Sequence, residues 1–373
     1  MKEHLKYLDG LRGLASFAVI LFHMDFFIGT MTSPSPGYGQ DSYLWQVYRR
    51  LLDGNFSVCV FFVLSGYSLI LSYYRTNNEK YLSEAVFKRY LRLTPLVAAS
   101  VIMSFLLWHN DLYFNKAAAS LIGGHDWFYN NFNGNPNFLD AIYQAILGVY
   151  LGNVSFNGPL WTIKIEFWAS LFLFAFCTFF YNQKKVILIS LITVFALILC
   201  LGVSGLYTSL FIAGALMLKM KRDKRLALLI MPAMLLGTEN RWSTVSAHSD
   251  SFLSQTLQID VTASSIIFHS IGACLLLIAV LNSSALQKLL SLRPFEFLGK
   301  ISFSMYVFHL PVVMSVGSWI MVYFYGSYGK VVVSALAIIV SIVVTLIISK
   351  LAYLLIDIPS QKLAKKLAKK VIS

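Results

Sequence analysis

The sequence predicts an all-α fold, a polytopic membrane helix bundle of about ten transmembrane helices with both termini in the cytoplasm. Of the 373 residues 57% are hydrophobic and only 13% are charged, which leaves too little polar surface for a water-soluble protein. Ten apolar segments approach the roughly 20 residues that a bilayer-spanning helix needs, although the sixth and seventh are short. They are residues 11–29, 56–74, 93–108, 162–181, 186–203, 205–218, 226–238, 261–281, 302–323 and 331–356.

The basic residues predict the orientation of these helices. With the N-terminus inside, 23 of the 30 Lys and Arg residues fall in inside segments and 5 in outside segments. This imbalance follows the positive-inside rule, so both termini should be cytoplasmic. We expect a multi-pass integral protein of the cytoplasmic (inner) membrane. The net charge of +13 therefore needs no nucleic-acid partner.

No linker or internal repeat divides the chain, so we expect one transmembrane domain over residues 1–358 and a basic tail over residues 359–373. In the tail, Leu363, Leu367 and Val371 share one helical face while lysines fill the rest. Such an amphipathic helix is expected to lie on the inner leaflet, where it anchors the last span.

The first apolar segment is read as a retained helix. A signal peptide is the alternative, but the segment contains Arg12 and His23 and lacks a small-residue cleavage pattern. The cysteines lie inside spans without paired or metal-like spacing, so we expect no metal. They are Cys59, Cys177, Cys200 and Cys274.

Titratable side chains inside the apolar segments are the candidates for chemistry. A charged side chain at bilayer depth costs at least about 2.5 kcal/mol, so it normally faces a cavity or a partner. Arg12 and His23 are separated along their helix by roughly 16 Å, with Arg12 near the inner surface and His23 past the midplane. A neutral imidazole can take a proton from an attacking hydroxyl, and the alternative is a satisfied structural histidine.

A polar and aromatic stretch at residues 109–158 is expected on the outer side. Aromatic rings mixed with Asn and Asp suit a sugar surface, and an interfacial aromatic belt with solvated turns is the alternative. The side chains concerned are His109, Asp111, His125, Asp126, Trp127, Tyr129, Asn130 and Asn131.

Five segments, in order along the chain, resemble the membrane acyltransferase 3 family. Its hallmark is Arg or Lys, ten residues, then His. The segments are YLDGLRGLA at residues 7–15 continuing to His23, FFVLSGY at 61–67, FKRYLRLTP at 87–95, GPLWTIKIE at 158–166 and ISFSMYVFHLP at 301–311.

The resemblance implies that residues 1–358 form an acyltransferase 3-type transmembrane domain. Members transfer an acyl group, commonly acetyl, from cytoplasmic acyl-CoA to a hydroxyl of a glycan or a lipid-linked saccharide. Acetyl-CoA would then be a donor substrate, and no permanently bound cofactor is expected. The remaining partners are membrane lipids.

Coenzyme A carries phosphates, and planar guanidinium groups suit phosphate. Arg12, Arg89 and Arg92 are therefore the expected donor-binding residues, with positive-inside placement as the alternative. Arg89 and Arg92 are three apart and share a helix face. Ser65 is expected to contact the pantetheine arm, and helix packing beside Gly66 is the alternative.

Glu166 is a second catalytic candidate beside His23, because a carboxylate in an apolar span needs a partner. We expect it to orient His23 or to bind the acceptor. An ion pair with Lys164 is the alternative, although residues two apart do not face each other on a helix. Lys164 also departs from the commoner family pattern. Trp161 and His309 are expected substrate-binding residues, with helix packing as the alternative for His309.

The resulting expectation is an enzyme, an O-acyltransferase with His23 as general base or, as the less favoured route, as an acyl carrier. A transporter or flippase of a lipid-linked glycan is the rival from another class. Broken helices and inverted halves would favour that rival, and the sequence displays neither. An inactive sensor or scaffold with the same fold is a further alternative.

Overall fold

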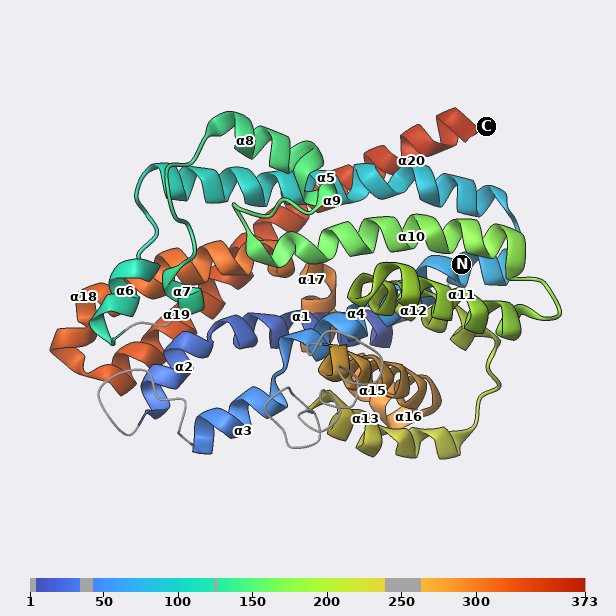
Figure 1. Cartoon of the computed structure of the whole chain (residues 1–373), viewed down its shortest axis with the longest axis horizontal. Coiled ribbons are helices and arrows are strands. Elements are labelled where there is room, and N and C mark those ends of the chain that lie inside the picture. The colour runs from blue at the N-terminus through green and yellow to red at the C-terminus, as the bar shows by residue number, and fades with distance from the viewer. Residues whose placement is uncertain (1–4, 34–42, 124–125, 239–262, 373) are drawn as a thin grey trace.

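The computed structural model describes residues 5–33, 43–123, 126–238 and 263–372, and every regular element within these ranges is a helix (Figure 1). The all-α prediction is confirmed. Each of the ten predicted apolar segments contains helix where the structure describes it.

Six helical runs in the described part of the chain are long and apolar enough to cross a membrane. They are Tyr43–Thr76 (α3, Tyr43–Leu51, and α4, Gly54–Thr76), Lys80–His109 (α5), Gly158–Phe180 (chiefly α10, Trp161–Phe180), Ser264–Asn282 (in α15, Ala263–Asn282), Arg293–Tyr328 (α17, Arg293–Val312, to α18, Ser318–Tyr328) and Lys330–Val371 (α19, Lys330–Ala352, into α20, Ile358–Ile372). A seventh is added if α1 (Lys6–His23) and α2 (Asp25–Thr32), which meet at 57°, form one span. The chain is a multi-pass membrane protein.

Three of the predicted spans form short helices. Val186–Leu201 (α11), Val203–Leu216 (α12) and Ile230–Gly237 (α13) have 16, 14 and 8 residues. About 20 residues are needed to cross the hydrocarbon core. The count of ten spans and the cytoplasmic location of both termini therefore stay predictions.

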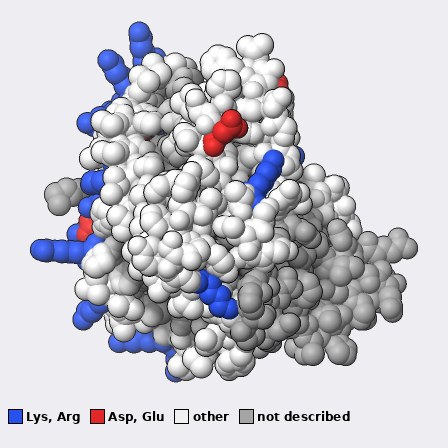
Figure 2. Space-filling view, turned by 90° about the vertical axis from the view of Figure 1, so that its left-hand side faces the viewer, with Lys and Arg blue, Asp and Glu red and all other residues white. Residues whose placement is uncertain are grey.

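Short helices connect the long ones. They are α6 (Asn115–Leu121), α7 (Asp126–Tyr129), α8 (Phe138–Tyr143), α9 (Val149–Leu151) and α16 (Ser284–Leu290). Figure 2 views the end of the bundle that carries α2, α6 and α18, and few charged side chains stand in the middle of that face. Of the residues named above, His125 lies outside the described ranges.

The helices α1 and α17 lie side by side (Figure 1) and cross where neither has room for a β-carbon. A Cβ on Gly13 would lie 2.4 Å from the backbone nitrogen of Gly299, and a Cβ on Gly299 would lie 2.4 Å from the carbonyl oxygen of Asp9. Nearby, the Ser16 hydroxyl donates to the carbonyl of Ser302 at 2.9 Å. Small residues let membrane helices approach closely, so this crossing fixes the register of α1 against α17.

The tail predicted at residues 359–373 is helical as α20 and packs along α5 (Figure 1). Ala364 and Ala368 are buried, whereas Leu363 and Val371 are exposed. The larger apolar side chains and the lysines thus share the outward surface of α20. Contact of this surface with the inner leaflet remains a prediction.

Replacing Gly13 by Ala should destabilise the protein, because the new methyl group meets backbone atoms that cannot move aside cheaply. Overpacking of this kind costs about 1–3 kcal/mol. The unfolding temperature of the purified protein in detergent should fall. Gly326→Ala is the matched control, since nothing lies within 4 Å of its Cβ position. Equal unfolding temperatures for the two variants would contradict the close crossing.

Candidate functional site

Five residues singled out from the sequence line one cavity of about 380 Å³. They are Arg12 on α1, Ser65 on α4, Arg89 and Arg92 on α5, and Glu166 on α10. Its size lies within the range of about 300–1,000 Å³ typical of small-molecule sites. Aromatic side chains from α4 and α17 complete the wall, so the cavity suits a ligand with anionic and apolar parts. These include Phe61, Phe62, Phe303 and Tyr306.

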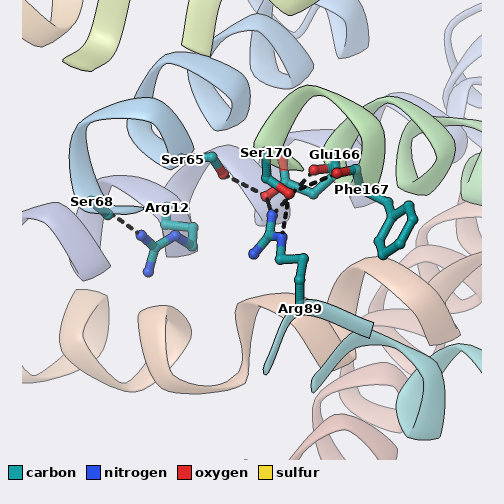
Figure 3. Close-up of polar contacts among 7 residues, drawn as sticks. All are labelled: Arg12, Ser65, Ser68, Arg89, Glu166, Phe167 and Ser170. Carbon is teal, nitrogen blue, oxygen red and sulfur yellow. Dashed lines mark hydrogen bonds and ion pairs between the residues drawn. The ribbon is translucent and has the colours of Figure 1, made fainter. Parts of the chain in front are cut away.

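A buried ion pair joins α5 to α10 in this wall (Figure 3). The Arg89 side chain is buried and its guanidinium pairs with the Glu166 carboxylate. Its Nε donates to Ser170 Oγ at 2.8 Å, and the Ser65 hydroxyl donates to Glu166 Oε1 at 2.9 Å. A buried guanidinium needs a partner for its charge, so Glu166 allows Arg89 to sit in the apolar bundle.

The partner of Glu166 differs from both sequence-based expectations. Lys164 is exposed and extends to Gly152, because residues two apart project from different sides of a helix. His23 has other partners, so the hypothesis that Glu166 orients His23 is wrong in this structure. A role of Glu166 toward an acceptor stays a prediction.

The other two arginines leave donors open to the cavity. Arg12 donates to Asp9 Oδ1 at 2.9 Å. It also donates to Ser68 Oγ at 3.2 Å (Figure 3). Arg92 is exposed and makes no hydrogen bond or ion pair within the described residues. A guanidinium has five N–H donors, so Arg92 in particular can offer its planar edge to an anionic ligand.

His23 lies at the end of α1, just before the break to α2, and is half-buried. Its Nδ1 lies 2.9 Å from the carbonyl oxygen of Val19 and 3.2 Å from Nε2 of His309 on α17. The ring of Trp127, on α7, lies 5.6 Å from the His23 ring, centroid to centroid. Trp127 is 45% exposed, so an accessible indole from the predicted sugar-binding stretch borders the histidine.

The residues that line the cavity do not include His23. Tyr306 lines the cavity, and its ring centroid is 5.9 Å from that of His309. Its hydroxyl accepts from Thr162 at 2.8 Å and donates to the Pro159 carbonyl at 2.8 Å. Tyr306 thus touches both the arginine-lined cavity and the histidine pair.

The two expected substrate-binding residues lie away from the cavity. Trp161 is 38% exposed and its ring lies against Tyr207 at 5.5 Å. His309 is fully buried and bonds to His23, so it cannot serve as an exposed contact for substrate. Its Nδ1 is occupied by backbone carbonyls of its own helix.

Sequence reasoning missed Tyr306 and Ser170, and helical spacing held a signal for both. Tyr306 is three residues before His309, and Ser170 is four residues after Glu166. Residues three or four apart lie on one helix face, so each shares the face of a residue already singled out.

Gly66 has the helix-packing role considered for it, since a Cβ there would lie 2.1 Å from the Phe211 carbonyl oxygen.

Comparison with known proteins shows the family to which this chain is similar. A model of the acyltransferase domain (Acyl_transf_3) matches residues 5–353. Acyltransferase R4 of Phoma sp. is 23% identical over 87% of this chain and 86% of its own length. O-acetyltransferase OatA of Staphylococcus aureus is 24% identical over 96% of this chain, which spans only 58% of that relative's length. O-acetyltransferase PaAT-1 of Phomopsis amygdali is 26% identical over 58% of this chain and 47% of its own length.

No solved structure matches the chain. The family model, however, covers nearly all of it, from before Arg12 to the end of α19. The chain therefore belongs to the acyltransferase 3 family and is a membrane acyltransferase.

Proposed function

We propose that this protein is a membrane-embedded O-acyltransferase of the cytoplasmic membrane that moves an acyl group, acetyl first among candidates, from acyl-CoA to a hydroxyl of a glycan or related acceptor. One observation carries the proposal: three arginines converge on a cavity whose wall includes Tyr306, beside the His309–His23 pair. The names of two relatives, both O-acetyltransferases, support the acetyl group and the oxygen acceptor.

The arginine-lined cavity suits the donor. Phosphates of coenzyme A would bind Arg12 and Arg92, which line the cavity, whereas the charge of Arg89 is taken up by its pair with Glu166. The pantetheine arm is long and less polar, and it would lie along Phe61 and the other aromatic side chains. Donor entry from the cytoplasm agrees with the predicted inside location of the arginines.

The thioester reaches His23 past Tyr306, which must give up its hydrogen bonds to Thr162 and Pro159. His23 takes the proton of the acceptor hydroxyl while the hydroxyl oxygen attacks the thioester carbonyl carbon. The carbon–sulfur bond then breaks, and the leaving thiolate takes the proton back from His23. The products are an ester and free coenzyme A, with no net gain or loss of protons.

The acceptor would approach from the side of Trp127. An exposed indole beside His23 can stack on the apolar face of a sugar ring and hold a hydroxyl near the imidazole. For Trp127, this contact favours the interpretation of residues 109–158 as a sugar-binding surface over the alternative of an interfacial aromatic belt.

A transporter or flippase remains the rival to be tested, because the 57° break between α1 and α2 at His23 resembles the broken helices of transporters. Purified protein incubated with labelled acetyl-CoA and candidate glycans separates the two. An enzyme releases free coenzyme A and labels the glycan. A transporter leaves the thioester intact, and that result would remove the proposal.

His23→Gln should lower the turnover of acetyl-CoA by roughly 10²–10⁴-fold, the usual contribution of a general base. Glutamine keeps a polar side chain but cannot cycle a proton near neutral pH. Labelled product formation by monodisperse, correctly inserted protein is the measurement. Wild-type turnover in this variant would exclude His23 from the reaction.

Arg92→Ala should raise the KM for acetyl-CoA by roughly 10- to 100-fold, because a charge-assisted hydrogen bond contributes about 1.5–3 kcal/mol. The KM for the acceptor should change little, since the phosphates and the acceptor are bound at different ends. Steady-state kinetics with each substrate varied in turn measures both. Arg225→Ala, an exposed arginine that does not line the cavity, is the control. Equal donor KM values for the two variants would contradict phosphate binding at Arg92.

Trp127→Ala should raise the KM for the glycan acceptor by roughly 3- to 10-fold with the donor KM unchanged, the size expected for one aromatic stacking contact. Trp319→Ala is matched to it, because Trp319 is 41% exposed on α18 and its ring contacts are to Tyr323 and Phe324. If both variants keep the wild-type acceptor KM, the acceptor does not use Trp127.

A further inference from the structure

The hydrogen bonds of His309 fix which of its ring nitrogens carries the proton. Its Nδ1 lies 2.7 Å from the carbonyl oxygen of Tyr306 and 3.3 Å from that of Met305. A carbonyl oxygen only accepts hydrogen bonds, so Nδ1 must be the N–H nitrogen. In a neutral ring the other nitrogen, Nε2, then carries a lone pair and acts as an acceptor.

The same reasoning shows which ring nitrogen of His23 carries the proton. Its Nδ1 faces two acceptors, the Val19 carbonyl oxygen at 2.9 Å and the lone pair of His309 Nε2 at 3.2 Å. Nδ1 of His23 must therefore be protonated, and its hydrogen is shared between these acceptors. With both rings neutral, this is the one assignment that satisfies every hydrogen bond of the pair, and it leaves the lone pair of His23 on Nε2.

The acidic residue nearest to His23 in the sequence has other partners and does not orient the His23 ring. Asp25, two residues after His23, accepts from Trp45 Nε1 at 2.8 Å and pairs with Arg49 at 3.7 Å. Nε2 of His23 has no hydrogen-bond partner within the described residues and is the ring nitrogen left for a substrate. His309, on α17, thus contacts Nδ1 of His23 with an imidazole. In hydrolytic triads a carboxylate occupies the same position.

We propose that His309 is a positioning residue: it holds His23 as the Nδ1–H tautomer, so that Nε2 is the nitrogen that takes the acceptor proton. The proposal rests on the proposed function of His23. When Nε2 accepts the hydroxyl proton, the His23 ring becomes an imidazolium, and its Nδ1–H strengthens its bonds to Val19 and His309. The proton leaves again from Nε2 to the thiolate, so His309 keeps its own proton throughout.

The tautomer can be measured without any substrate. In protein labelled with ¹⁵N-histidine, the His23 signals are identified by their loss in His23→Gln. We expect the Nδ1 shift of His23 in the N–H range and the Nε2 shift in the lone-pair range. In His309→Phe, which keeps an aromatic ring but has no acceptor, a population with Nε2 protonated should appear. A wild-type His23 with its proton on Nε2 would overturn the proposal.

Kinetics provides the second measurement. His309→Phe should lower kcat by roughly 10- to 100-fold, the usual effect of losing the group that orients a histidine, with both KM values within about twofold of wild type. His309→Gln, whose side-chain oxygen can accept from His23, should recover most of the loss. A His309→Phe enzyme with wild-type kcat, or equal loss in the Phe and Gln variants, would contradict the positioning role.

A matched control is available in His269→Phe. His269 is also buried, but it contacts Asn55 and Asp53 in a separate cluster and does not touch His23. This variant should leave the His23 signals unchanged. The hypothesis that His23 is the base and the hypothesis that His309 positions it fail separately. Full activity of His23→Gln would remove the proposed base and leave the tautomer as measured. An inactive His23→Gln, together with a wild-type His23 protonated on Nε2, would remove only the role of His309.

Discussion

The crossing of α1 and α17 is the constraint on which the site depends. Gly13 and Gly299 bring the two backbones so close that no side chain separates them, and this sets one rotation and one depth for each helix. In that register Arg12 enters the cavity from α1, and His23, eleven residues further along the same helix, meets His309. A rotation of α1 would displace both side chains at once. The glycines therefore matter for chemistry as well as for stability.

A second constraint is the charge of Arg89. Burying a guanidinium among apolar helices is unfavourable unless a carboxylate and hydrogen-bond acceptors surround it. Glu166 and Ser170 supply these from α10, and Ser65 ties the carboxylate to α4. Three helices are thus held around a ligand-sized cavity. Because Arg89 is paired with Glu166 and Arg12 with Asp9, Arg92 is the arginine of the three whose charge has no carboxylate partner within the described residues.

The two halves of the proposed reaction occupy different places in the bundle. The arginines line the cavity, the histidine pair lies beside Trp127 outside it, and Tyr306 contacts both the cavity and His309. Such a division allows a donor and an acceptor to arrive from opposite sides of a membrane without an open channel through the protein. The acyltransferase 3 family model spans the residues of both groups, so the cavity and the histidine pair belong to one domain.

The sequence by itself determined the helical class and the position of each apolar segment, because hydrophobic length is a local property that a stretch of chain carries without its neighbours. It also singled out residues that gather at the site: Arg12 and Glu166 as charges within apolar spans, and Arg89 and Arg92 as guanidinium groups suited to phosphate in a segment that resembles the family. Only the tertiary structure decided the partners: Glu166 meets Arg89 instead of His23, and His309 meets His23 instead of substrate. Contacts between helices depend on rotation, depth and close approach, which arise from packing across the whole bundle and leave no trace in a hydropathy pattern.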